Sequence, residues 1–122
     1  MPKPSSIYPK RGEIWIVDLI PGKGWEVAKK RPAIIISANE INKISPLAII
    51  VPISSNVPSV IGPERVLIEK GSLLEKDSIA LPNQIRAVDK SRISKRIGAL
   101  SPNKLEEVED ALKLVLGITK LD

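Results

Sequence analysis

The chain contains no cysteine and no histidine, and these two absences limit the chemistry it can perform. Without cysteine there is no disulfide, no thiolate nucleophile and no cysteine-bound metal. Without histidine the commonest acid–base group near neutral pH is missing, and so is the commonest metal ligand. Any enzyme with this sequence must therefore manage without either residue.

Aromatic side chains and long apolar runs are also scarce. Aromatic residues make up 2% of the chain and phenylalanine is absent, so there is no array of rings on which single-stranded bases could stack. The longest apolar run, Leu47–Ile53, is far shorter than the ~20 residues that cross a membrane. The amino-terminal segment has no apolar stretch of signal-peptide length. We therefore expect a soluble, cytoplasmic protein.

Aliphatic residues and positive charge are what the chain has in abundance. Hydrophobic residues, mostly Ile, Leu and Val, form 43% of its 122 residues. This length suits one domain with a real core, and β-branched side chains favour strands. The net charge of +5 lies mainly in residues 1–61. A basic surface attracts nucleic acid or acidic partners, although it does not define a function by itself.

Short strands separated by Pro- and Gly-containing turns are the main expected elements. We expect strands at 13–19, 31–37, 47–55, 65–69, 77–81, 84–88 and 96–100. Turns or single helical turns are expected at 38–45, 71–76 and 89–94. The proline-containing residues 1–10 are expected to be a flexible arm, which leaves 11–122 as the single domain.

One helix is predicted near the carboxyl end. Ser101 is a suitable N-cap, Pro102 suits the first helical position, and Gly117 is a plausible residue just after the end. The apolar residues between them follow helical spacing on one face: Leu105, Val108, Ala111, Leu112 and Val115. Short strands followed by one packed helix suggest a small, strongly bent sheet or barrel.

The stretch Gly22–Ser37 joins a flexible, basic loop to a strongly apolar strand. Pro32 fixes its own φ, and its ring pushes Arg31 towards an extended conformation. The guanidinium of Arg31 therefore starts from a defined backbone position at a strand mouth, where scaffolds commonly present functional side chains. We interpret Arg31 as the centre of an anion-binding site, with a phosphodiester as the expected anion. The alternative is a solvated surface loop, and no phosphate-loop pattern is present.

Three other polar segments have both a functional and an ordinary interpretation. Ser54, Ser55 and Asn56 follow a predicted strand, although such residues commonly bond local backbone in turns. Gln84 and Arg86 alternate with apolar residues, which also fits an ordinary polar sheet face. The charged residues between 89 and 96 are most simply a solvated turn.

A series of short motifs, taken in order, resembles the MazF/PemK toxin family. The resemblance runs from about Lys10 to Gly117, and the predicted helix fits it too. The motifs are Arg11-Gly-Glu-Ile-Trp, Gly24-Trp-Glu, Lys30-Arg-Pro, Pro52-Ile-Ser-Ser-Asn, Asp77-Ser, Gln84-Ile-Arg and Asp89-Lys-Ser-Arg.

The resemblance implies a mainly β fold with a C-terminal helix, a small SH3-like barrel like those of MazF, PemK and CcdB. It implies a homodimer and a metal-independent endoribonuclease that needs no cofactor. Such toxins cut single-stranded RNA at short sequences and leave a 2′,3′-cyclic phosphate and a 5′-hydroxyl. A cognate antitoxin silences them, and we expect it to cover the basic groove.

The resemblance also assigns site residues. The family's catalytic arginine corresponds to Arg31, its catalytic hydroxyl to Ser54, where Thr is usual, and its acidic residue to Glu26. Because arginine is a poor proton acceptor, Glu26 is the better candidate base. Trp25 replaces a small polar residue and could either stack on a base or cover the loop. The expected RNA-binding residues are Trp25, Lys23, Lys30, Ser55, Asn56, Gln84 and Arg86.

Two other functions fit the same sequence features. The related gyrase-poisoning toxins share the fold and bind DNA gyrase or another protein target without RNA chemistry. Arg31, Ser54 and Glu26 argue against that reading, because an inhibitor need not have them. A plain basic RNA-binding module is the third possibility, and the shortage of stacking residues weakens it.

Overall fold

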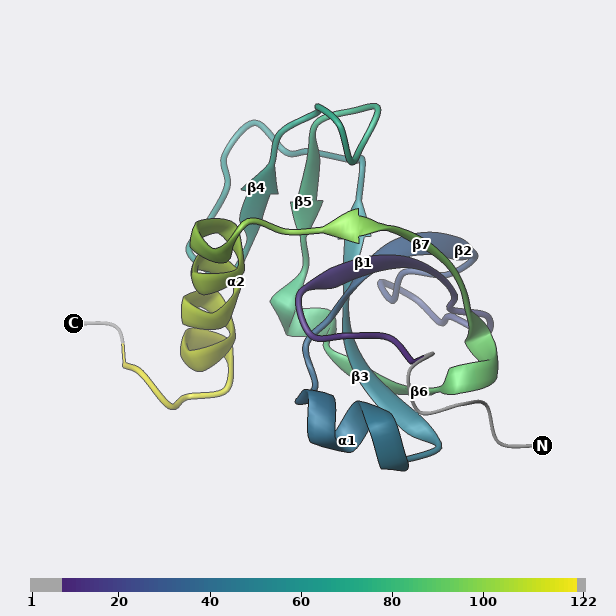
Figure 1. Ribbon diagram of the computed structural model, residues 1–122. Coiled ribbons are helices and arrows are strands. Elements are labelled where there is room, and N and C mark those ends of the chain that lie inside the picture. Colours follow the sequence, from purple (N-terminus) through teal and green to yellow (C-terminus); the bar gives the residue numbers. More distant parts are fainter. Residues whose placement is uncertain (1–7, 121–122) are drawn as a thin grey trace.

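The structure is a computed structural model that describes residues 8–120 (Figure 1). Most of the arm expected at residues 1–10 lies outside the described residues. The elements, in order, are β1 (Glu13–Asp18), β2 (Lys30–Ile35), α1 (Asn39–Ile44), β3 (Leu47–Ser54), β4 (Val66–Ile68), β5 (Ser78–Ala80), η1 (Pro82–Gln84), β6 (Arg86–Asp89), η2 (Lys90–Arg92), β7 (Ile93–Ala99) and α2 (Pro102–Val115).

All strand pairs are antiparallel, and β3 is the strand around which the sheet bends. The strand order is β4-β5-β3-β2-β1-β7, and β6 also pairs with β3. On one edge β3 pairs with β2, while its other edge pairs first with β6 and then with β5. Among the described residues no ladder joins β7 to β4 or β6. The mainly β fold with a C-terminal helix is confirmed, but the sheet is not closed into the expected barrel.

Both faces of β3 are buried from Ile50 to Ser54, whereas Leu47 and Ile49 near its start are exposed. Val51 and Ile53 face one core cluster, which also contains Val108 and Leu112 of α2. Ala48 and Ile50 face a second cluster with residues of β1 and β6. Since side chains alternate along a strand, β3 links the two clusters through opposite faces. Figure 1 shows α2 packed beside β4, where it closes the first cluster.

The C-terminal helix follows its local sequence signals. The Ser101 hydroxyl oxygen accepts a hydrogen bond from the Lys104 N–H at 3.2 Å, as an N-cap does. Gly117 follows the last turn with φ at +75°, a conformation that favours glycine. In the part of the chain that the structure describes, no helix has the length and apolar character needed to cross a membrane.

Two strand starts differ from the sequence-based prediction by two residues or more. The strand expected at 84–88 begins only at Arg86, because Pro82 starts a 3₁₀ turn in which the Gln84 N–H bonds to Leu81 O. Strand β7 begins at Ile93 rather than at residue 96, since Asp89 caps η2 and ends the turn early. The segment 71–76 is a tight connection without a helical turn, which is one of the two forms expected for it.

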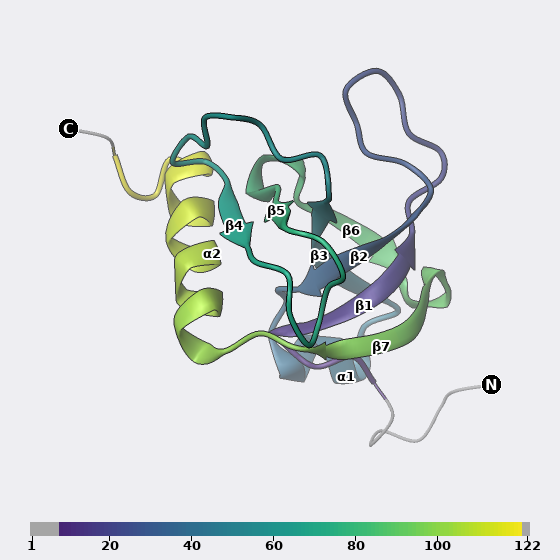
Figure 2. The same ribbon diagram turned by 90° about the horizontal axis from the view of Figure 1, so that it is seen from above.

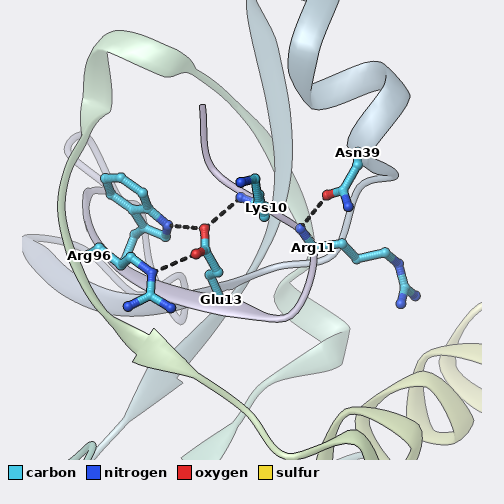
Figure 3. A network of polar contacts seen from close by, with 6 residues as sticks. Lys10, Arg11, Glu13, Asn39 and Arg96 are labelled. Atoms are coloured by element: carbon cyan, nitrogen blue, oxygen red, sulfur yellow. Dashed lines mark hydrogen bonds and ion pairs between the residues drawn. The ribbon is translucent and has the colours of Figure 1, made fainter. Parts of the chain in front are cut away.

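A partly buried carboxylate fixes the start of the sheet (Figure 3). Glu13 accepts hydrogen bonds from the Lys10 N–H at 2.7 Å, Trp15 Nε1 at 3.0 Å and Arg96 Nε at 2.5 Å. Burial raises the pKa of Glu13, but these hydrogen bonds together outweigh it and leave that pKa below its ordinary value. The motif that begins at Arg11 therefore ties β1 to β7.

Candidate functional site

The long loop between β1 and β2 projects from the body on the side away from α2 (Figure 2). Its base closes through a hydrogen bond from the Leu19 N–H to Lys29 O at 2.9 Å. Its tip is a turn in which the Glu26 N–H bonds to Lys23 O at 3.1 Å. The Glu26 carboxylate accepts the Lys23 N–H at 2.7 Å in return. Glu26 therefore stabilises the loop turn in this structure.

Side chains of η1 and β6 hold this loop to the body through hydrogen bonds. Gln84 accepts the Val27 N–H on Oε1 at 2.7 Å and donates Nε2 to Trp25 O at 3.2 Å. On the other arm of the loop, Arg86 donates to Leu19 O at 3.4 Å. Gln84 thus fastens residues 25–27, in the second half of the loop, to the body with two hydrogen bonds.

Arg31 lies at the start of β2, half-buried, where the loop joins the strand. Its Nε donates to Ala28 O at 2.6 Å. Within residues 8–120 its two terminal Nη groups have no hydrogen-bond partner in the chain, so both can donate to an anion. A guanidinium fixed at Nε and open at both Nη atoms is suited to bind phosphate with two parallel hydrogen bonds.

Ser54 ends β3, on the side of the ladder where β2 begins. The β2–β3 ladder ends with Ala33 paired to Pro52, and Arg31 and Ser54 each lie two residues beyond that pair on their own strands. Ser54 is buried, and its oxygen accepts the Asn56 N–H at 3.1 Å. Its hydroxyl hydrogen remains able to donate.

The predicted site residues lie in two hollows, on the open surface or, in the case of Ser54, inside the fold. The basic hollow, of about 440 Å³, is lined by Arg31, Lys30 and Ser55 among others. The loop hollow, of about 280 Å³, is lined by Glu26, Gln84 and Arg86 among others. The other predicted residues, Lys23, Trp25, Ser54 and Asn56, line neither of these two hollows.

Trp25 is 98% exposed, so its indole does not cover the loop in this structure. An indole that stands free at the tip of a projecting loop can stack on a base. Among the described residues there is no group of three or more His, Cys, Asp or Glu side chains placed to hold a metal ion.

The sequence interpretation missed Lys29 and Lys76 as lining residues of the basic hollow. Lys29 belonged to the predicted basic loop, so its charge was visible in the sequence. Lys76 comes from the β4–β5 connection, and only the fold brings it to the mouth of β2. The neighbouring Asp77-Ser78 motif was its sole local signal.

Known proteins resemble this chain over nearly its whole length. A family described as PemK-like, MazF-like toxins of type II toxin–antitoxin systems matches residues 10–116. The endoribonuclease MazF of Staphylococcus epidermidis is 38% identical over 114 residues, which cover 93% of this chain and 95% of that protein.

Solved structures show the same fold. MazF of Deinococcus radiodurans superposes with a TM-score of 0.79 at 24% identity, over 91% of this chain and 98% of that one. A mycobacterial endoribonuclease in complex with its cognate antitoxin gives a TM-score of 0.76 at 20% identity, over 93% and 99% of the two chains.

Proposed function

The chain belongs to the PemK-like, MazF-like toxins of type II toxin–antitoxin systems, and we propose that it is an endoribonuclease that cleaves single-stranded RNA at short sequences without a metal ion. The observation that carries the proposal is Arg31, whose two Nη groups have no partner within residues 8–120 and which lies, like Ser54, just beyond the last paired residues of β2 and β3. This pair presents a permanent cation and a hydroxyl donor, which suit a phosphodiester.

The proposed reaction uses the nucleophile that RNA itself carries. The ribose 2′-oxygen attacks the adjacent phosphorus and loses its proton, while the bond from phosphorus to the 5′-oxygen breaks and that oxygen takes up a proton. The products are a 2′,3′-cyclic phosphate and a 5′-hydroxyl. Negative charge grows on the two non-bridging oxygens, where the Arg31 guanidinium stabilises it. Ser54 donates its hydroxyl hydrogen to the same phosphate, and its bond from Asn56 orients that hydroxyl.

Glu26 is the proposed proton acceptor. Arginine stays protonated in proteins, so Arg31 stabilises charge and does not accept a proton. The Glu26 carboxylate accepts the Lys23 N–H at 2.7 Å and lines the loop hollow. Its Oε2 atom has no hydrogen-bond partner within residues 8–120, so this oxygen can accept a proton.

The remaining proposed contacts lie around this centre. Lys23 and Lys30 are exposed and attract the RNA backbone, and Trp25 stacks on a base. Four further residues contact the strand through hydroxyl, amide or guanidinium groups: Ser55, Asn56, Gln84 and Arg86.

We also propose that the protein is a cytoplasmic homodimer silenced by a cognate antitoxin. The net charge of +5 favours an acidic or amphipathic antitoxin segment that covers the basic surface and excludes RNA. A complex that left Arg31 and the Trp25 loop fully accessible would contradict this mode of inhibition.

Purified protein on a defined RNA with EDTA present tests the function. Wild type should cut the RNA, Arg31→Ala should lose cleavage, and Lys43→Ala, which removes an equal charge on the distant α1, should cut like wild type. Uncut RNA with wild type, or equal cutting by Arg31→Ala, would overturn the proposal. Inhibition of gyrase supercoiling without RNA cleavage would favour a protein-binding toxin instead.

A further inference from the structure

The basic hollow is larger than a single phosphate requires, and part of it comes from a segment with no role in the proposed reaction. We propose that this hollow binds one nucleotide of the RNA, next to the cleaved bond, and that Lys76 holds its phosphate. The inference rests on the proposed function and names a specificity site for it. The volume of about 440 Å³ lies in the usual range for small-molecule pockets.

The floor of the basic hollow is apolar. Ile53 and Leu74 are buried, while Leu73 and Ile97 are half-buried and also line the space. Apolar side chains can pack against the faces of a base, as aromatic rings do elsewhere. The floor therefore offers a place for a base in a protein that has few rings.

The rim of the basic hollow is strongly positive. Lys29, Lys30 and Lys76 are exposed there beside Arg31, and Glu75 is the carboxylate that lines the same space. In residues 8–120 none of these three lysines is part of an ion pair. Unneutralised ammonium groups around an apolar floor match a nucleotide, with its phosphate at the rim and its base inside.

The segment that carries Lys76 is fixed by its own hydrogen bonds. The Lys70 N–H donates to the Asp77 carboxylate at 2.8 Å, and the Gly71 N–H donates to Leu74 O at 2.9 Å. The Ser78 hydroxyl then donates to Lys76 O at 2.9 Å. The backbone of Lys76 is thus held in place before any ligand arrives.

Leu73 packs the β4–β5 connection against β7. A Cβ added at Gly98 would lie 2.3 Å from Leu73 Cδ2, so only glycine lets the leucine side chain lie so close to the strand. This contact places one wall of the hollow against β7, while Arg31 at the mouth of β2 forms another. Because Arg31 lines the hollow, a nucleotide bound there is adjacent to the phosphate that Arg31 contacts.

Lys76→Ala tests the phosphate contact, with Lys43→Ala as the control. Both lysines are exposed, and Lys43 lies on α1, which Figure 1 shows far from the β4–β5 connection. Lys76→Ala should raise KM for a mapped RNA site about tenfold with little change in kcat, and should reduce the salt slope of binding by about 0.7. Lys76→Arg should restore KM, and Lys43→Ala should match wild type.

A second variant tests the base pocket. Leu73→Ala widens the floor, so cleavage-site mapping on a long RNA should show relaxed preference at one nucleotide beside the cut. Thermal melting identifies any loss of folding separately. If Lys76→Ala and Leu73→Ala both cut with wild-type KM and preference, the inference is overturned while the endoribonuclease proposal stands. A change in oligomeric state without a change in KM would assign the hollow to contact between copies and would also overturn it.

Discussion

Arg31 is the residue on which the proposed reaction depends, and its neighbours explain its geometry. Pro32 restricts its backbone, and Ala28 O fixes its Nε. We predict that Arg31→Lys lowers kcat by about 100-fold or more, because an ammonium cannot supply two parallel hydrogen bonds to the phosphate. Single-turnover cleavage of a mapped RNA measures this. A wild-type rate would mean that positive charge alone suffices.

Ser54 is proposed to act only through its hydroxyl. We predict that Ser54→Ala lowers kcat by about 10- to 100-fold with little change in KM, since one phosphate hydrogen bond is lost. Ser94→Ala is the control, because Ser94 is exposed and its hydroxyl donates only to Ile16 O at 3.2 Å. Equal rates for both variants would remove Ser54 from the reaction.

Glu13 gives the fold a pH dependence. Its folded-state pKa lies below the ordinary value, because hydrogen bonds from Arg96, Lys10 and Trp15 outweigh the opposing effect of burial. A lowered folded-state pKa stabilises the fold at neutral pH, and this stabilisation is lost as pH falls through that pKa.

We therefore predict that Glu13→Gln lowers the free energy of unfolding by about 1 kcal/mol at pH 7, or about 4 °C in Tm. The difference from wild type should shrink as pH falls through the lowered pKa, because protonated glutamic acid and glutamine are both neutral there. Thermal melts of both proteins from pH 7 to pH 3 test this. A difference that stays constant over that range would rule out the carboxylate charge as its source.

At the scale of elements, the loop between β1 and β2 depends on Gln84. Its two hydrogen bonds fasten the backbone carbonyl of Trp25 and the backbone N–H of Val27 to the body. We predict that Gln84→Leu speeds hydrogen exchange of the Val27 amide by about 10- to 30-fold, because the hydrogen bond that this amide donates to Gln84 is lost. The neighbouring, exposed Asn83→Leu is the control. Unchanged exchange in Gln84→Leu would show that the loop is held by other contacts.

The elements whose signals are local were predictable from the sequence. Helix α2 follows directly from Ser101, Pro102 and Gly117, since caps act within one turn. The prediction that a strand starts at Gln84 was wrong, because Pro82 begins a 3₁₀ turn at a place where side-chain alternation indicated a strand. Side-chain alternation describes a strand face but does not show where a proline starts a helical turn.

The candidate site was predictable in part, for a similar reason. Arg31 at a strand mouth followed from Pro32, which acts on its immediate neighbour. The place of Lys76 depends on how the β4–β5 connection packs, including the contact between Leu73 and Gly98, which are far apart in sequence. The two hydrogen bonds from Gln84 to the β1–β2 loop likewise join residues that are far apart in sequence, so no local pattern could predict them.

At the scale of the whole molecule, β3 explains both the open sheet and the site. It pairs with β2 on one edge and with β6 and β5 on the other, so the sheet bends along it. Its carboxyl end lies towards the start of β2, so Ser54 and Arg31 both lie just past the last β2–β3 pair. The molecule thus presents a basic strand mouth beneath a projecting loop, a surface suited to a flexible anionic strand.

The central claim is that the protein positions RNA for attack by its own 2′-hydroxyl, and one substitution in the substrate tests it most directly. A mapped RNA is compared with the same RNA carrying a single 2′-deoxy nucleotide on the 5′ side of the cut, both with EDTA. We predict that the first is cut to a 2′,3′-cyclic phosphate and a 5′-hydroxyl, identified by mass spectrometry, and that the second stays intact at that site. Cleavage of the deoxy substrate there, or a linear phosphate as the first product, would contradict the mechanism.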